Sequence, residues 1–149
     1  MANTNPIYTN TPVIGCANLT GSIANTASSG AGTIASTMFT AFTAGSNGSY
    51  VVFARISGTA NTASTTMTAS QVRLYVSSQT SGSTTSANTW LIQEVSVTAI
   101  VVDNPNVAIP FIQVPLNFSL PANYTIQAST HAAVASNTTW QVVVFGGNY

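Results

Sequence analysis

The sequence has almost no ionic side chains. Its 149 residues include two Arg, no Lys, one His and two acidic residues, so charged residues make up 3% of the chain. Ordinary soluble domains contain about 25% charged residues, with both signs spread over the surface. The surface of this protein must instead be built mainly from neutral Thr, Ser, Asn, Ala and Gly. Because such a surface can be covered without removing water from ions, we expect contacts with other copies or with a large partner.

The missing charges also exclude classes of function. Two arginines are too few to neutralise a nucleic-acid backbone, so no nucleic acid is expected as a partner. An active site needs several convergent reactive groups, and the chain has one His, one Cys, one Glu and one Asp. We therefore expect no enzyme, no metal and no other cofactor. The catalytic alternatives are a serine with His131 and Asp103, or a carboxylate pair of Glu94 and Asp103, and no motif supports either.

Three further absences concern redox chemistry and targeting. Cys16 has no second cysteine to pair with, and its apolar neighbours predict a small buried side chain. The longest apolar-rich run, residues 95–102, is far shorter than the roughly 20 residues of a membrane-spanning helix. Residues 1–6 have neither a basic start nor an apolar stretch, so we expect no signal peptide. The protein is therefore expected to accumulate in the cytoplasm of the cell that makes it, without secretion or membrane insertion.

β-forming segments fill the rest of the chain. Stretches rich in Val, Ile, Thr and aromatic residues alternate with clusters of Gly, Ser, Asn and Pro, and no stretch has a sustained helical period. About eight strands follow, which predicts an all-β, antiparallel β-sandwich, with an eight-stranded jelly roll favoured over other sandwich topologies. The expected strands are residues 11–20, 33–43, 49–57, 71–77, 88–98, 111–120, 124–130 and 138–145, with room for a short one within 99–110.

One domain accounts for most of the chain. Residues 1–12 are rich in Asn and contain two prolines, and we expect them to form an extended N-terminal arm. Residues 13–149 would form a single β-sandwich domain. The polar connections at 58–69 and 78–87 are long enough for crossings from one sheet to the other.

The alternation of side chains in strands predicts which residues share a face. Arg73 and Tyr75 are expected on the outer side of their strand, and Arg73 could pair with Glu94 across two strands. The apolar sets expected to share a face are Val52, Ala54 and Ile56 on one strand, and Val72, Leu74 and Val76, pointing inward, on another.

The sheet edges are difficult to protect in this sequence. Natural sheets guard exposed edges with lysines, inward charges, prolines or bulges, and lysine is absent here. Pro110, Pro115 and Pro121 could blunt one edge. We expect the remaining edge to be covered by a neighbouring subunit, which predicts a homo-oligomer.

Several segments resemble a family of small virion proteins encoded by tailed phages and prophages. These short segments are spread along nearly the whole length of the chain. They are residues 2–12 (ANTNPIYTNTP), 39–48 (FTAFTAGSNG), 72–76 (VRLYV), 115–121 (PLNFSLP) and 140–149 (WQVVVFGGNY).

The resemblance implies a capsid decoration (cement) or head-fibre role. The leading hypothesis is a decoration protein that binds the outer capsid surface as an oligomer, a homotrimer in the first instance, and stabilises the head. Its partners would be other copies of the chain and the major capsid protein, and its location the virion. The residues expected to make these contacts are Asn3, Asn5, Pro6, Ile7, Tyr8, Arg55, Arg73 and Trp90.

Two other non-enzymatic functions remain open. A head-fibre or tail-tip recognition module would bind host glycans through its Thr- and Asn-rich loops. A bacterial surface or pilus subunit would share the low charge, although the missing secretion signal argues against it. Trp90 and Trp140 are expected to be core or interface anchors rather than sugar platforms.

Overall fold

The computed structural model describes residues 9–20, 24–60, 65–102 and 111–149. Within these ranges the chain forms twelve β-strands and no helix, as its β-forming composition predicts. The strands are β1 (Thr11–Thr20), β2 (Gly32–Thr33), β3 (Phe39–Thr43), β4 (Ser49–Ala60), β5 (Thr65–Met67), β6 (Ser70–Ser77), β7 (Ser83–Thr84), β8 (Thr89–Val97), β9 (Ile100–Val102), β10 (Phe111–Leu120), β11 (Thr125–Thr130) and β12 (Thr138–Asn148).

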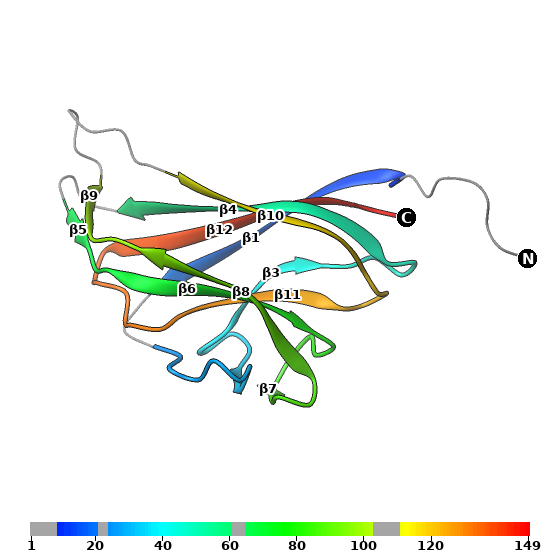
Figure 1. The fold of residues 1–149 in the computed structure, drawn as a ribbon, viewed down its shortest axis with the longest axis horizontal. Coiled ribbons are helices and arrows are strands. Elements are labelled where there is room, and N and C mark those ends of the chain that lie inside the picture. The colour runs from blue at the N-terminus through cyan, green and yellow to red at the C-terminus, as the bar shows by residue number, and fades with distance from the viewer. Residues whose placement is uncertain (1–8, 21–23, 61–64, 103–110) are drawn as a thin grey trace, which may run out of the picture.

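The eight longer strands form two four-stranded sheets that face each other (Figure 1). The first sheet has the order β1-β12-β4-β10, and the second has the order β3-β11-β6-β8. All of these pairings are antiparallel. The other four strands pair in two short ribbons, β2 with β7 and β5 with β9. The all-β, antiparallel prediction is confirmed and is consistent with a sandwich, but the expected strand number of about eight is lower than the twelve observed.

Strands that follow one another in the chain mostly lie in different sheets. Among the eight longer strands, each connection crosses between sheets except that from β6 to β8, which are neighbours in the second sheet. The crossing predicted at residues 58–69 is confirmed, because this connection leads from β4 to β6. The crossing predicted at residues 78–87 is wrong, because the chain returns there to the adjacent strand of the same sheet.

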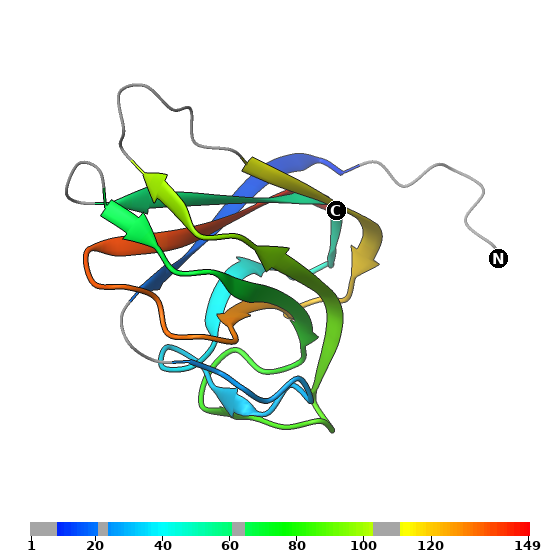
Figure 2. The same cartoon turned by 60° about the vertical axis from the view of Figure 1, so that its left-hand side comes forward.

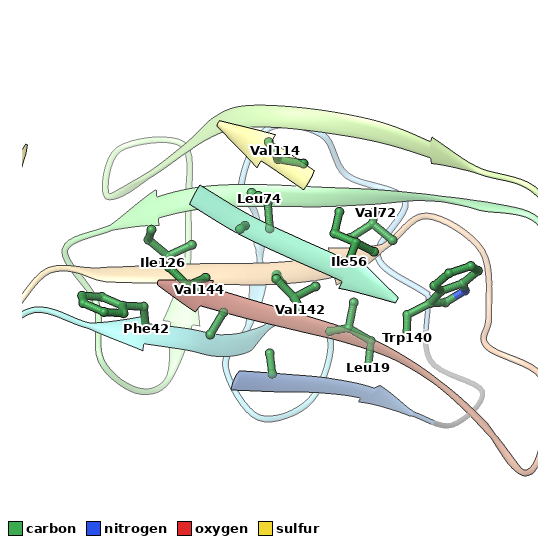
Figure 3. Packing of buried hydrophobic residues seen from close by; sticks show 14 of the residues in the cluster. Leu19, Phe42, Ile56, Val72, Leu74, Val114, Ile126, Trp140, Val142 and Val144 are labelled. Carbon is green, nitrogen blue, oxygen red and sulfur yellow. The ribbon is translucent and has the colours of Figure 1, made fainter. Parts of the chain in front are cut away.

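The hydrophobic core lies between the two sheets (Figure 3). Most of the inward residues of both sheets are small or branched, and several are completely buried. Trp140, which was expected to anchor either the core or an interface, belongs to this core. The main contributors are Leu19, Ile56, Val114, Val142 and Val144 from the first sheet, and Phe42, Val72, Leu74 and Ile126 from the second.

A β-bulge in β4 overturns one prediction. The register between β4 and β12 skips Val52, which is an extra residue in its strand. Because an extra residue reverses the alternation of side chains, Val51 is buried on the same side as Ala54 and Ile56. Val52 itself is 41% exposed, so the expectation that it shares a face with Ala54 and Ile56 is wrong.

The two sheets meet closely along one side of the molecule. There β1 lies against β3, and the approach requires a glycine, because a Cβ atom on Gly15 would overlap the carbonyl oxygen of Ala41. The last strands of the two sheets, β8 and β10, form the opposite side. A small apolar hollow lies between them, lined in part by Val97, Ile112 and Trp140.

Candidate contact surface

The outer face of the second sheet is covered by the chain itself. Residues 24–38 and 78–89 fold over it and are joined by the β2–β7 ribbon (Figures 1 and 2). Tyr75 of β6 is fully buried beneath this layer, and its hydroxyl donates to the carbonyl oxygen of Ala27 at 3.3 Å. Thr84 of β7 is also buried. The loops therefore act as a third layer on this side of the molecule.

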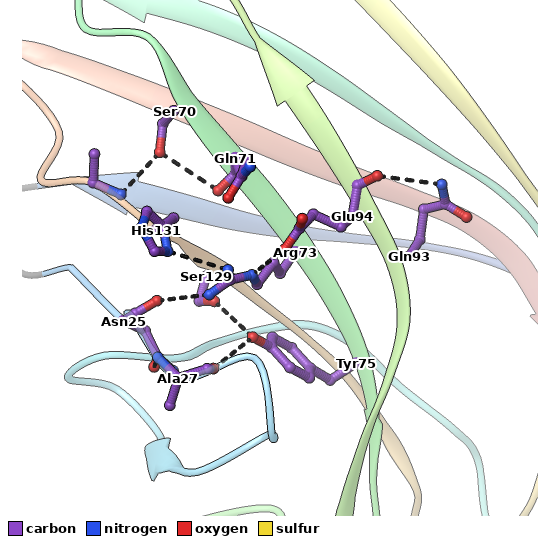
Figure 4. Close-up of polar contacts among 11 residues, drawn as sticks. Asn25, Ala27, Ser70, Gln71, Arg73, Tyr75, Gln93, Glu94, Ser129 and His131 are labelled. Atoms are coloured by element: carbon purple, nitrogen blue, oxygen red, sulfur yellow. Dashed lines mark hydrogen bonds and ion pairs between the residues drawn. The ribbon is translucent and has the colours of Figure 1, made fainter.

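Arg73 is the centre of an ionic cluster at this layer (Figure 4). Its Nε donates to Oε2 of Glu94, the residue directly opposite on β8. Its Nη1 donates to the carbonyl oxygen of Asn25 at 3.1 Å, and its Nη2 lies 3.1 Å from Nδ1 of His131. Since a guanidinium has donors and no acceptor, Nδ1 of a neutral His131 accepts this hydrogen bond. The predicted pair of Arg73 and Glu94 is confirmed. The hydrogen bond from Arg73 to the Asn25 carbonyl connects the loop at Asn25 to the sheet.

Neutral hydrogen bonds complete the covered layer. The Nε2 atom of Gln127 donates to the hydroxyl oxygens of Thr125 at 2.8 Å and Thr40 at 2.9 Å. The hydroxyls of Ser77 and Thr89 lie 2.7 Å apart. Across the part of the chain that the structure describes, no buried side-chain nitrogen or oxygen lacks a hydrogen-bond partner. The polar face of this sheet is thus satisfied within one chain.

The burial of Arg73 and Tyr75 qualifies the sequence-based expectation. Alternation correctly puts both residues on the outer side of β6, but the loops cover that side and both side chains are buried. The alternation of side chains along a strand indicates on which side of the sheet a residue lies, but not what packs against that side. The guanidinium of Arg73 makes all its contacts inside the chain, which leaves little of it for the intermolecular contact proposed from the sequence.

The outer face of the first sheet has no comparable cover, and in Figures 1 and 2 no described segment lies over it. An apolar side chain from each of its four strands lies in one line across the sheet. The rings of the central pair, Phe53 and Phe145, stack with centroids 4.5 Å apart. We call this set the apolar row, and in order across the sheet it consists of Ile14, Phe145, Phe53 and Pro115.

The two ends of the apolar row are exposed, its two central rings are half-buried, and one cation lies beside it. Ile14 is 66% exposed. Arg55, the next outward residue of β4 after Phe53, is also exposed, and its guanidinium carbon lies 3.7 Å from the centre of the Phe111 ring. This is a cation–π contact. Among the described residues, no carboxylate side chain lies on this face, so Arg55 has no counter-ion within it and remains a candidate contact residue.

Cys16 lies on the same face and corrects a further prediction. Its partner across the strands is Val143 of β12, and its side chain is exposed. The expectation of a buried Cys16 is wrong, because Ala17 and Leu19 are the residues of β1 that face the core. Partial burial nevertheless raises the pKa of the Cys16 thiol. A raised pKa disfavours the thiolate, which is the reactive form.

The remaining expected contact residues fall in two groups. Trp90 lies on the edge strand β8 and is 44% exposed, and its neighbour Leu91 is 39% exposed. The arm residues lie outside the described residues, although Thr11 and Pro12, which the expected arm includes, already belong to β1. The contact residues of this arm that the structure does not describe are Asn3, Asn5, Pro6, Ile7 and Tyr8.

The apolar row was not among the residues selected from the sequence. A signal for it exists, because residues 49–57 and 138–145 both carry large apolar side chains at inward and at outward positions. Such strands predict two apolar faces. What the sequence does not provide is the register, which places Phe53 beside Phe145 although they are distant in the chain.

The described residues offer no cluster of side chains suited to hold a metal ion. They contain no group of three or more His, Cys, Asp or Glu side chains placed to hold a metal ion. The hollow between β8 and β10 has an almost entirely apolar lining. No helix capable of spanning a membrane occurs among the described residues.

Comparisons with models of protein families, with curated proteins and with solved structures return no match. The resemblance to phage virion proteins therefore stays a prediction from the sequence.

Proposed function

We propose that this protein is a structural component of a tailed-phage particle, a decoration protein that binds the outer surface of the assembled capsid as an oligomer. The observation that carries the proposal is the open outer face of the first sheet. It presents the apolar row to solvent, with Arg55 as its one charged side chain among the described residues. A monomeric soluble protein rarely leaves a continuous apolar strip of this kind uncovered.

The order of the strands supports a viral role for the fold. Numbered along the chain, the eight longer strands have the orders 1-8-3-6 and 2-7-4-5 in the two sheets. This is the order expected for a jelly roll, an architecture found in viral capsid and lectin domains. We therefore propose a jelly roll, with the β2–β7 and β5–β9 ribbons as additions to it.

The proposed mechanism is stabilisation by added contact. Each bound copy would bury surface shared between capsid subunits, so binding would favour the assembled shell by linkage. The arm, with Asn3, Asn5, Pro6, Ile7 and Tyr8, would pair its backbone with a neighbouring sheet edge. Because β1 begins at Thr11, roughly 10 residues precede it and could reach about 33 Å. Contacts with so few ions would depend weakly on salt.

Particle composition tests this proposal directly. Particles released by cells that carry the gene would be purified on a density gradient and inventoried by mass spectrometry. We expect the chain to co-sediment with the major capsid protein in stoichiometric amounts, and to remain bound after washing in high salt. Its absence from purified particles would overturn the proposal.

A second candidate is a recognition module that binds host glycans. The observation that favours it is the exposed indole of Trp90, since an exposed aromatic ring can stack on a sugar. Binding of the purified protein to a glycan array, lost in Trp90→Ala and retained in Trp140→Phe, would support this candidate over decoration.

A further inference from the structure

Two apolar regions lie on different sides of the molecule. The first is the apolar row on the outer face of the first sheet. The second is the edge strand β8, where the consecutive residues Trp90 and Leu91 are 44% and 39% exposed. Consecutive residues of a strand point to opposite faces, so β8 presents apolar side chains on both sides of a backbone edge that pairs with no other described strand.

One type of contact between copies can cover both regions. If two copies met face to face across a two-fold axis, each would cover its apolar row and leave β8 exposed. If β8 of one copy packed on the apolar row of the next, both regions would be buried in a single repeated contact. Such a heterologous contact closes into a ring when its rotation permits, and the smallest ring has three members.

The charges favour the contact between unlike surfaces. Among the described residues, Arg55 has no carboxylate partner on the open face, whereas Glu94 on β8 is paired with Arg73 and still has 37% of its side chain exposed. A face-to-face pair would bring two Arg55 side chains into one interface, to which the described residues add no carboxylate side chain. Packing β8 on the face brings a carboxylate to the side where Arg55 lies, which is the complementary arrangement.

The available area is sufficient for a specific contact. Four strands about 4.8 Å apart and about 33 Å long give a sheet face of roughly 600 Å². Covering the whole of that face would bury on the order of 1,200 Å² over both partners, which is the lower end of the range for stable interfaces. A ring makes this contact once per copy, so the contacts reinforce one another.

We propose that β8 of one copy docks on the apolar row of a second copy, and that three copies close into a ring. The occupant of the open face is therefore another copy of this chain. The inference rests on the proposed function in requiring self-association, but it makes no use of the capsid. Failure of the ring would leave particle binding to be decided by the particle inventory.

Sedimentation velocity of the full chain, with paired variants, tests the ring. Phe145→Arg places a charge in the apolar row, and Trp90→Arg places one on β8. Val101→Arg is the matched control, because Val101 is a 40% exposed apolar residue on the separate β5–β9 ribbon. We expect the wild type and the control to sediment as trimers and each of the two variants as monomers. Ile14→Arg and Leu91→Arg serve as second face and edge variants if either first variant does not fold.

Mixing the two broken variants gives the decisive result. The Phe145→Arg chain retains an intact edge, and the Trp90→Arg chain retains an intact face, so an equimolar mixture should form a two-chain complex that cannot grow further. A face-to-face dimer predicts the reverse, with Trp90→Arg still paired with itself and no mixed species. A monomeric wild type, an edge variant that assembles normally, or a mixture without the two-chain complex would each overturn the inference.

Discussion

The outer faces of the two sheets differ in their cover and in the use of charge. Beneath the loops of the second sheet, Arg73 and Tyr75 find all their partners within one chain. On the first sheet, Ile14 and Phe53 lie in an apolar strip without a cover of described chain, and the guanidinium of Arg55 rests on an aromatic ring. A satisfied polar face gains little from a further partner, whereas an apolar face in water gains free energy when it is covered. The side of the second sheet is therefore satisfied within one chain, whereas the side of the first sheet is the one on which we propose that a partner binds.

The largest expected difference between the faces comes from the same substitution at the two arginines. Arg73→Met should lower the free energy of unfolding by about 2–3 kcal/mol, because it leaves the Asn25 carbonyl and Glu94 without their buried partner. Arg55→Met should change it by less than about 0.5 kcal/mol, since Arg55 is exposed. Urea unfolding of the wild type and the two variants at one protein concentration measures both changes in unfolding free energy. Equal losses at the two positions would contradict the contrast between the faces.

A smaller effect is expected when a hydroxyl is removed from the covered layer. Tyr75→Phe should cost about 1 kcal/mol of unfolding free energy, because the Ala27 carbonyl loses a buried hydrogen bond. Tyr149→Phe removes a hydroxyl that hydrogen-bonds to exposed Ser119 and provides the control, with an expected loss well below 0.5 kcal/mol. A Tyr75→Phe protein as stable as this control would mean that the loop layer is not held by these contacts.

The smallest expected effect uses Cys16 as a reporter on the open face. Because its pKa is raised in the folded chain, the thiolate fraction at pH 8 is smaller than in the unfolded chain, and labelling by a disulfide reagent should be slower in buffer than in urea. The raised pKa also sets how stability depends on pH. The contribution of the neutral thiol to the free energy of unfolding is present below its unfolded pKa of about 8.5 and is lost as the pH rises through the higher pKa of the folded chain.

Labelling also sharpens the comparison of the faces. If other copies cover the open face, Phe145→Arg should speed the labelling of Cys16 relative to the wild type, and Val101→Arg should not. Equal rates in all three proteins would indicate that Cys16 lies outside any contact between copies.

Much of the strand pattern could be read from the sequence. The expected strands at residues 11–20 and 111–120 coincide with β1 and β10, because alternating apolar residues bounded by Gly, Asn and Pro are a local signal. The strand expected at 33–43 was too long, since a turn separates β2 from β3. The loop at 78–87 joins two neighbouring strands of one sheet, although its length predicts a crossing between sheets. The composition of a loop does not indicate which strand follows it in space. The pair of Arg73 and Glu94 was found from the sequence, and the apolar row was not.

By itself, the sequence determined the all-β character, the near-absence of ions and the alternation within each strand, because each depends on residues that are neighbours in the chain. Tertiary structure alone decided that loops bury Arg73 and Tyr75, that a bulge exposes Val52, and that Ile14, Phe145, Phe53 and Pro115 form one row. The physical reason is that register and cover depend on contacts between segments far apart in the sequence, and a local pattern carries no information about which segments will meet.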